Sequence, residues 1–222
     1  MLIHLSETEV ENDDSQKNHR MSPTEYLESL GFLKPGTLGA HGVWLSDADL
    51  GILRKHGVSL SHNPESNMKL ASGTARVPAL RRAGVPVGLG TDGAASNNRL
   101  DVMGEMRTAA LLAKGTSGNA AAVSAADTLE MATLEGARAL GLDAGIGSIE
   151  RGKWADLAAV ELSSLETLPC FDPVSHLVYA AGREHVTHAW VAGEARLDGR
   201  RLVTLDEQDL RDKAHWWRTR LS

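Results

Sequence analysis

Four residues of the kinds that bind metal ions each close a short apolar run of the sequence. They are His4, His41, His62 and Asp92, at the ends of the runs 2–4, 37–41, 58–62 and 85–92. Imidazole nitrogens and carboxylate oxygens bind Zn²⁺ in sites that activate water. These residue types therefore predict metal-assisted hydrolysis, provided that the fold brings the four run ends together.

The spacing of these residues indicates the elements that must position them. The intervals of 37, 21 and 30 residues are about what a strand, a helix and two loops require. Helical patterns lie between the apolar runs, at residues 23–32, 46–57 and 75–84. This alternation is typical of a parallel α/β sheet, and a parallel barrel builds its active site at the carboxyl ends of its strands. The chain has room for only four such strands.

Start and stop signals accompany the predicted helices. Ser22 is a candidate cap with Pro23 in the first turn, Ser46 begins the second helix, and Gly57 and Gly84 end the second and third. Two further helices are expected at residues 99–113 and 124–141, joined by a loop at 114–119. Their methionines and leucines fall at helical spacing, which predicts core packing.

The pattern changes after residue 145 to short β runs separated by glycine turns. The runs cover residues 147–162, 174–180 and 186–197, and a polar helix is expected at 206–221. We therefore predict a partial barrel at 1–144, a small β domain at 145–205 and a C-terminal helix at 206–222.

The motif HisLeuSerGlu at residues 4–7 places Glu7 three residues beyond His4. In a strand the two side chains would face opposite sides, so the strand must end at His4 and the loop must curl Glu7 back over the site. A metal-bound histidine with a nearby carboxylate can activate water and move its proton. The motif alone is weak, because His-x-x-Glu often arises by chance.

Two loops that follow predicted strands carry polar residues with two open interpretations. GlyThrAspGlyAlaAlaSerAsnAsn at residues 90–98 either places Asp92 at a barrel mouth or forms an Asx-turn before a helix. SerHisAsnProGluSerAsn at residues 61–67 either contributes to a site or caps a loop.

Taken together, four segments closely resemble the amidohydrolase superfamily. They are HisLeuSerGluThr, GlyAlaHisGly, SerHisAsnProGluSerAsnMetLysLeu and GlyThrAspGlyAlaAlaSerAsnAsn. Within that superfamily the chain is most similar to the 5′-methylthioadenosine/S-adenosylhomocysteine deaminases and their chlorohydrolase relatives. The resemblance runs from His4 through GlyLysTrpAlaAspLeu at residues 152–157. It implies the C-terminal half of a (β/α)8 TIM-type barrel, strands 5–8, plus part of a small β-sandwich domain.

The resemblance implies a role for each matched residue. His4 and Asp92 would ligate one divalent metal, zinc, and Asp92 would also accept a proton from the attacking water. Glu7 would shuttle that proton to the purine ring and the leaving amine, and His41 would hydrogen-bond the attacking hydroxide. Glu7, His41 and Asp92 are thus the expected catalytic and substrate-binding residues, in a deaminase that releases ammonia.

The remaining candidates are expected to be structural. His62 is predicted to pack near the site without binding metal, and Arg20 is expected to face solvent. Cys170 lies in a proline-rich loop without a nearby base and is not expected to be a nucleophile. The histidines that match no ligand of the resembled family are His19, His56, His176, His185, His188 and His215.

The chain departs from the resembled family in one respect. Members of the resembled family begin the barrel with a His-x-His strand that supplies two metal ligands. No His-x-His occurs in this sequence. Two hypotheses follow. Either the chain is the C-terminal portion of a deaminase, inactive alone, or it is a truncated remnant or interaction module without catalysis. Within the enzyme hypothesis, dechlorination or deamination of a triazine, guanine or other ring is the competing reaction.

Composition narrows the class of partner. The 222 residues are 42% hydrophobic, carry a net charge of −6 and contain one cysteine. This negative net charge argues against a nucleic-acid surface. The single cysteine suits a reducing cytoplasm. The sequence contains no apolar run of 18 residues, so no membrane span is expected. A small-molecule nucleoside is the expected ligand. The open edges of a half-barrel would favour pairing with another chain or a homo-oligomer.

Overall fold

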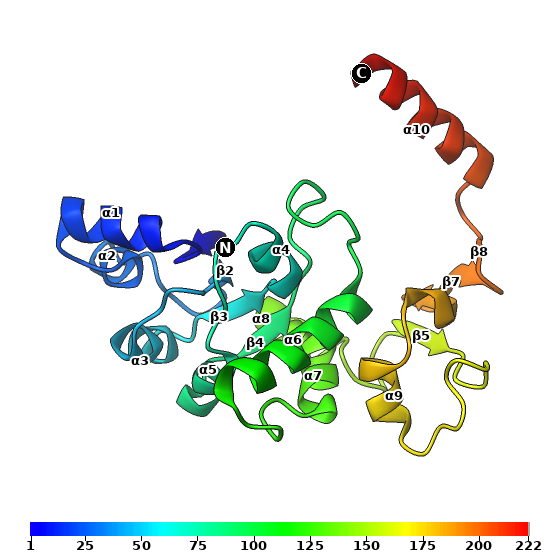
Figure 1. Cartoon of the computed structure of the whole chain (residues 1–222), viewed down its shortest axis with the longest axis horizontal. Helices are drawn as coiled ribbons and strands as arrows, with labels where there is room; N and C mark the ends of the chain where they lie inside the picture. Colours follow the sequence, from blue (N-terminus) through cyan, green and yellow to red (C-terminus); the bar gives the residue numbers. More distant parts are fainter. Residues whose placement is uncertain (222) are drawn as a thin grey trace.

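A four-stranded parallel sheet organises the first part of the chain. The computed structural model describes residues 1–221, and the sheet has the strand order β1-β2-β3-β4 (Figure 1). Its strands are β1 (Leu2–Leu5), β2 (Leu38–His41), β3 (Ser59–His62) and β4 (Val87–Leu89). Because all four are parallel, their carboxyl ends lie at one edge of the sheet.

Helices connect the strands, as parallel neighbours require. Those before β4 are α1 (Glu9–His19), α2 (Pro23–Ser29), α3 (Asp47–Lys55), α4 (Pro64–Lys69) and α5 (Val77–Ala83). The predicted caps are confirmed. Ser22 and Ser46 form capping boxes at the starts of α2 and α3, and Gly84 ends α5 with a φ of +78°, which glycine adopts at little cost.

The alanine-rich region differs from the prediction at two points. α6 spans Val102–Ser117, so most of the predicted loop at 114–119 is helical. The helix predicted at 124–141 is instead two helices, α7 (Ala125–Ala132) and α8 (Leu134–Leu140), which meet at Thr133. The bend brings α8 close to β4, where a Cβ added to Gly88 would lie 2.9 Å from the Cα of Gly136. Two glycines thus permit an approach that larger residues would block.

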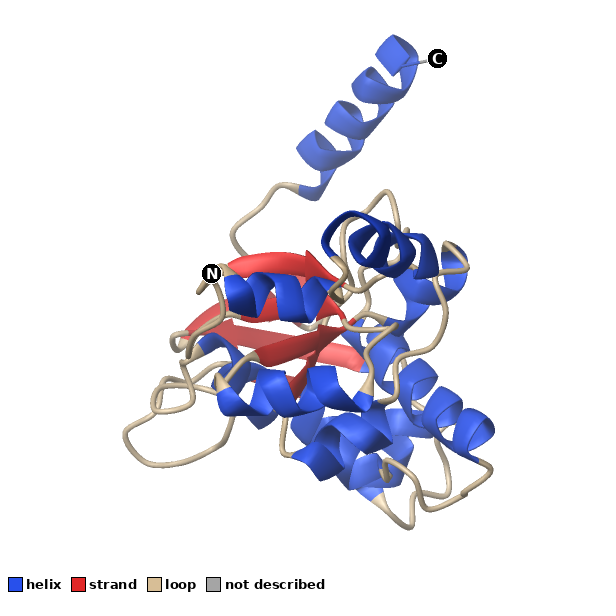
Figure 2. Cartoon of the chain, turned by 90° about the vertical axis from the view of Figure 1, so that its left-hand side faces the viewer, coloured by secondary structure: helices blue, strands red, loops and turns tan. Residues whose placement is uncertain are grey.

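The main hydrophobic core lies between one face of this sheet and α3 and α5. Leu53, Val58, Leu60, Leu80 and Val87 are at most 1% exposed and belong to one cluster. Burying a side chain of this size stabilises the fold by roughly 1.5–3 kcal/mol. This packed layer holds the strand ends in place. Figure 2 views the sheet from the α1–α2 side.

The opposite face of the sheet is partly open. Leu2 is 67% exposed and His4 is also exposed. Toward β3 and β4, α8 partly covers this face and leaves a hollow of about 310 Å³ beside Ser61 and Gly88. The face therefore lacks the complete helix or strand cover that buried parallel sheets usually have.

A second, antiparallel sheet follows in the order β5-β6-β7-β8. Its strands are β5 (Leu157–Val160), β6 (Val186–Val191), β7 (Glu194–Asp198) and β8 (Arg201–Leu202). The strands expected within 147–162 and 186–197 are present. The division of the chain at residues 144 and 205 stays a prediction.

The β run predicted at 174–180 is wrong. This segment is α9 (Pro173–Tyr179), followed by a 3-10 turn at Arg183–His185. The side chain of Asp172 caps the helix by accepting hydrogen bonds from the amides of Val174 and Ser175, and Pro173 stands at its first position. Val178 is buried against Met106 and Ala110 of α6. A cap and one tertiary contact therefore outweigh the β tendency of a short apolar run.

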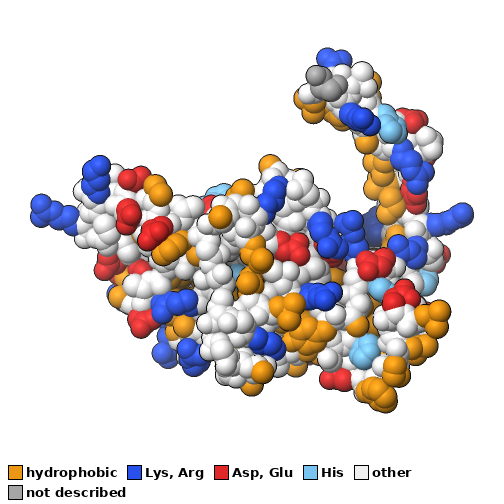
Figure 3. Space-filling model, viewed as in Figure 1, with side chains coloured by type: hydrophobic (Ala, Val, Ile, Leu, Met, Phe, Trp, Pro, Cys, Tyr) orange, Lys and Arg blue, Asp and Glu red, His pale blue; other side chains and the backbone are white. Residues whose placement is uncertain are grey.

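The last helix, α10 (Glu207–Leu221), projects away from the rest of the molecule (Figure 1) and has no buried residue. Figure 3 shows exposed hydrophobic side chains along this projecting helix. Leu210, Trp216 and Trp217 are among its exposed residues. Among residues 1–221, no helix combines the length and apolarity needed to cross a bilayer.

Candidate metal centre

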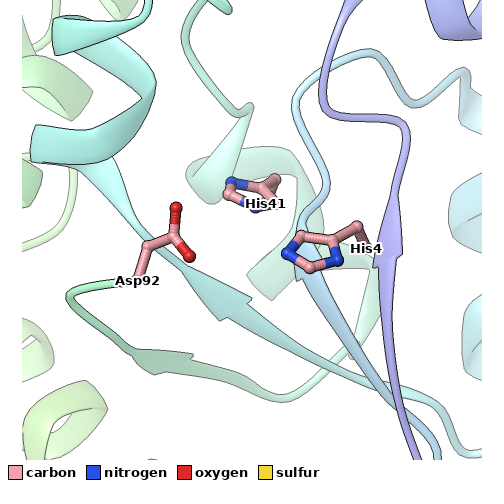
Figure 4. A group of neighbouring side chains, drawn as sticks. All are labelled: His4, His41 and Asp92. Atoms are coloured by element: carbon pink, nitrogen blue, oxygen red, sulfur yellow. The ribbon is translucent and has the colours of Figure 1, made fainter. Parts of the chain in front are cut away.

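His4, His41 and Asp92 converge at the carboxyl edge of the parallel sheet (Figure 4). Each offers one ligand atom, and these three atoms lie within 4.8 Å of one another. In a tetrahedral zinc site with bonds of ~2.0–2.1 Å, two ligand atoms lie about 3.3 Å apart. Small side-chain rotations therefore suffice for the three atoms to share one cation.

The three residues reach this point in different ways. His4 lies within β1, which continues to Leu5, so the expectation that the strand ends at His4 is wrong by one residue. His41 ends β2 with a φ of +76°. Asp92 lies three residues beyond the end of β4 at Leu89, with a φ of +60°. The left-handed backbone at His41 and Asp92 is uncommon for residues with a side chain and redirects each chain at the strand end.

The His41 ring is held by a hydrogen bond at one of its two nitrogens. Its side chain is 1% exposed, and Nδ1 donates a hydrogen bond of 2.8 Å to Oδ1 of Asn67. In a neutral imidazole, a proton on Nδ1 leaves the lone pair on Nε2. This buried atom has no hydrogen-bond partner within residues 1–221. The rings of His41 and His4 are stacked with centroids 5.3 Å apart, so both present nitrogens to the same space.

Asp92 is held as a carboxylate by two hydroxyl groups. Ser66 and Ser96 donate hydrogen bonds of 2.8 and 2.5 Å to its Oδ2. Burial raises the pKa of Asp92, but these hydrogen bonds, the Gly93 amide and the nearby His41 outweigh burial, so the pKa lies below its ordinary value. Both hydroxyl groups donate to Oδ2 of Asp92, so Oδ1 is left available for a cation.

Glu7 lies beside the cluster, where the sequence predicted a loop that curls back. Its Oε2 is 3.7 Å from Nε2 of His41, and Ser72 donates a hydrogen bond of 3.3 Å to Oε1. The loop is fastened by Glu11 of α1, whose carboxylate accepts hydrogen bonds from the amides of Ser6 and Glu7 at 2.8 and 2.7 Å. A carboxylate, an imidazole nitrogen and a candidate cation site thus lie together.

The structure places the other candidates outside this cluster. His62 is buried, and burial, with a smaller effect of His41, lowers its pKa to about 4. Arg20 ends α1 and is exposed. His56 pairs with Glu28 at 2.7 Å. Among residues 1–221, His4, His41 and Asp92 form the one group of three or more candidate ligands close enough to share an ion.

The sequence interpretation missed the residues that orient the cluster. Ser66 and Asn67 are consecutive on α4, and Ser96 lies in the turn after Asp92. Both segments were recognised as polar loops after strands, with capping left open as an alternative. The signal was present in SerHisAsnProGluSerAsn, but the helix that aims Ser66 and Asn67 in one direction was not predicted.

Comparison with known proteins assigns the chain to a family. The model of the amidohydrolase family matches residues 1–196. The chain therefore belongs to the amidohydrolase family, as the four segments indicated.

Among characterised relatives, a 5′-deoxyadenosine deaminase from Methanosarcina mazei is 46% identical over 212 residues, which are 96% of this chain and 49% of the relative. A 5-methylthioadenosine/S-adenosylhomocysteine deaminase from Syntrophobacter fumaroxidans is 44% identical over 216 residues, 97% of this chain and 49% of the relative. The chain thus spans about half the length of the relatives that it matches.

Solved structures give the same result. An adenosine deaminase from Xanthomonas campestris with bound Zn superposes with a TM-score of 0.96 at 46% identity, covering 99% of this chain and 50% of the other. An atrazine chlorohydrolase from Arthrobacter aurescens in complex with zinc gives a TM-score of 0.90 at 26% identity, with 96% and 47% covered. The α/β fold of this chain is therefore that of half an amidohydrolase.

Proposed function

We propose that this chain supplies half of the active site of a metal-dependent hydrolytic deaminase. Its substrates would be adenosine-type thioether nucleosides such as S-adenosylhomocysteine and 5′-methylthioadenosine. The observation that carries the proposal is the convergence of His4, His41 and Asp92 beside Glu7. The two deaminase relatives support the reaction and the substrate class. On this proposal β1–β4 are strands 5–8 of a (β/α)8 barrel, and β5–β8 belong to a small β-sandwich domain.

The residues of the cluster fit a divalent cation. The buried Nε2 of His41 has no hydrogen-bond partner within the described residues, which would be costly unless another group satisfied it. A negatively charged carboxylate and two imidazoles match the ligand preference of zinc, the metal bound by the Xanthomonas and Arthrobacter proteins. We propose that His4 and Asp92 hold the metal.

His41 is proposed to hold water rather than metal. Its Nε2 faces both the candidate cation and the Glu7 carboxylate, 3.7 Å away, so it lies among the groups that handle protons. Because Nδ1 donates to Asn67, Nε2 can accept a hydrogen bond from the attacking water. It would thereby orient the water toward the ring carbon.

The chemistry follows from these positions. A bound zinc ion supplies Lewis-acid activation of water at neutral pH. Asp92 would accept a proton from the attacking water, and Glu7 would carry a proton to a ring nitrogen and then to the amine. A carbon–oxygen bond would form first, as the ring nitrogen takes one proton of the water. The carbon–nitrogen bond to the amino group would then break, and ammonia would leave with the second proton while the ring carbon becomes a carbonyl. The products are ammonia and a hypoxanthine ring.

The same geometry predicts that the chain is inactive alone. Catalytic zinc sites normally have three protein ligands and structural ones four, and His4 and Asp92 provide two. The competing hypotheses are a remnant or interaction module without catalysis, and a related hydrolase acting on a triazine or guanine. On composition alone, we propose that the enzyme is cytoplasmic and acts on a small nucleoside, without a nucleic-acid or membrane partner.

A complementation experiment tests the proposal. The 222-residue chain would be purified alone and after co-expression with the half of the Methanosarcina mazei deaminase that it does not match. Bound zinc would be measured, together with ammonia release from S-adenosylhomocysteine, 5′-methylthioadenosine and guanine and chloride release from atrazine. A matched control carries Asp92→Asn.

We expect no turnover by the chain alone, and zinc with ammonia release from the two thioether nucleosides by the complemented protein. Ammonia release by the chain alone would contradict its predicted dependence on a second half. A complemented protein that holds zinc but releases ammonia only from guanine, or none from any substrate, would exclude the proposed activity.

A further inference from the structure

A fully buried carboxyl group, Glu105 of α6, joins two segments next to the metal centre. Glu105 is 0% exposed. Its Oε2 accepts a hydrogen bond of 3.1 Å from the amide of Glu65, at the start of α4. Its Oε1 accepts a hydrogen bond from Nδ2 of Asn97, in the loop after Asp92. One side chain thus fastens α4 and this loop to the same point.

Both segments orient the candidate site. α4 carries Ser66, which donates to Asp92, and Asn67, which accepts from His41. The loop carries Ser96, which donates to the same oxygen of Asp92. Asp92 and His41 therefore form all three of these hydrogen bonds with segments that Glu105 ties together.

The surroundings of Glu105 are acidic and contain no paired cation. Within the described residues no Lys, Arg or His forms an ion pair with it, and its charged neighbours are the carboxylates of Glu65 and Asp101. Burial is the largest effect on the pKa of Glu105, and with these acidic neighbours it raises the pKa to about 7. The hydrogen bonds that Glu105 accepts act in the opposite direction. A buried carboxyl without a cation is costly, and the hydrogen bonds that it accepts from Glu65 and Asn97 offset part of this cost.

We propose that Glu105 is a positioning residue for the metal centre: by accepting hydrogen bonds from Asn97 and from the amide of Glu65, it fixes the directions of Asp92 and His41. This inference rests on the proposed function, because it assigns Glu105 to the same site. Glu105 itself does not contact Asp92 or His41 and acts through α4 and the loop.

The hydrogen-bond pattern makes the proposal specific to a carboxyl group. Both partners of Glu105 are N–H donors, so both of its oxygens must accept. The amide of Asn97 cannot turn round freely, because its Oδ1 accepts a hydrogen bond of 3.1 Å from the amide of Arg99. Glu105→Gln keeps the size of the side chain but places an NH₂ group against one of the two donors.

A compensating exchange separates positioning from packing. In the double variant Asn97→Asp with Glu105→Gln, the glutamine NH₂ donates to the new aspartate, and its oxygen still accepts from the amide of Glu65. The new aspartate also keeps the acceptor for Arg99. Thr108→Val is the matched control, since it removes a hydrogen bond of 3.1 Å between α6 and Glu65 without changing the contacts of Asn97.

Two measurements on the full chain decide the proposal. Histidine-ring ¹⁵N spectra of the metal-free protein report whether His41 carries its proton on Nδ1. Zinc affinity, from competition with a chromogenic chelator, reports the whole cluster. Loss of a residue that orients ligands lowers metal affinity by about 10–100-fold, and we expect this loss for Glu105→Gln. We also expect its His41 spectrum to shift toward the mixture of tautomers found in free imidazole.

The double variant should regain the wild-type His41 spectrum and most of the zinc affinity, and Thr108→Val should keep both. An unchanged His41 spectrum in folded Glu105→Gln, or failure of the double variant to recover it, would overturn the inference. If the chain alone holds no zinc, the affinities are measured on the complemented protein. Failure to bind zinc there would exclude the proposed metal function, while the His41 spectra still decide the role of Glu105.

Discussion

Nε2 of His41 lies 3.7 Å from Oε2 of Glu7, and neither residue owes its position to the other. Glu7 is held by Glu11 of α1 and by Ser72, while His41 is held by Asn67 of α4. A buried imidazole nitrogen and a half-buried carboxylate are thus brought together by separate supports. This arrangement is suited to passing protons next to a cation.

The first prediction concerns Glu7 as the proton shuttle. In the complemented protein, Glu7→Gln should lower the rate of ammonia release by about 10²–10⁴-fold, the usual contribution of general acid–base catalysis. The rate falls because the glutamine amide cannot carry the proton. Zinc content should stay unchanged, because Glu7 is not proposed to hold the metal. Steady-state kinetics and metal analysis would check this. Glu9→Gln, at an exposed position two residues later, is the control, and an equal loss there would argue against the assignment.

The second prediction concerns His4 as a metal ligand. His4→Ala should lower zinc affinity by more than about 100-fold. Loss of a residue that only orients the ligands costs up to about 100-fold, and loss of a ligand should cost more. Equilibrium dialysis of zinc against the folded chain measures it. His19→Ala is a matched control, because His19 is also exposed but stacks on Tyr26 with centroids 3.8 Å apart. Zinc affinity that is equal in the two variants would remove His4 from the site.

The third prediction is a pH dependence of stability that arises from Glu105. Its pKa is about 7 in the fold and about 4.3 when unfolded, so between these values the folded state binds more protons. Its contribution to the free energy of unfolding is therefore full below the unfolded pKa and is lost as pH rises through 7. At one pKa unit per 1.36 kcal/mol, the change is on the order of 3 kcal/mol.

Urea unfolding at pH 5 and pH 8 of the wild type and of Glu105→Gln would measure this contribution. His62, whose pKa is lowered to about 4, has the opposite effect: its contribution is lost as pH falls from the unfolded pKa toward 4. The comparison with Glu105→Gln cancels the effect of His62, which both proteins contain. Identical pH dependence in the two proteins would show that Glu105 does not titrate as stated.

The fourth prediction concerns the open edge of the parallel sheet. β1 is an edge strand, and Leu2 on it is 67% exposed, which favours pairing with another chain. The isolated chain should therefore self-associate with rising concentration, and Leu2→Lys should shift it toward monomer in light-scattering measurements. Leu30→Lys changes a leucine that is 61% exposed at the end of α2. A wild-type chain that stays monomeric, or an equal effect of Leu30→Lys, would contradict this role of the edge.

Local signals in the sequence were sufficient for much of the fold. Ser22 and Ser46 each satisfy backbone amides within their own helix start, so their caps could be predicted without knowledge of distant residues. The apolar runs predicted all four parallel strands for the same reason. The four polar segments also indicated the amidohydrolase family, which the family comparison confirms. The roles of His4, Glu7, His41 and Asp92 stay predictions, although the structure brings them together.

Other features depended on contacts between distant parts of the chain. Beyond its local cap by Asp172, the helix Pro173–Tyr179 is stabilised by the packing of Val178 on α6. The helix predicted at 124–141 bends at Thr133 where α8 meets β4. The sequence by itself determined which residues could bind a cation and which strands carry them. Only the tertiary structure decided that α4 and the loop after Asp92 orient them through Glu105. A buried hydrogen bond depends on where two distant segments meet, and short-range patterns do not contain that information.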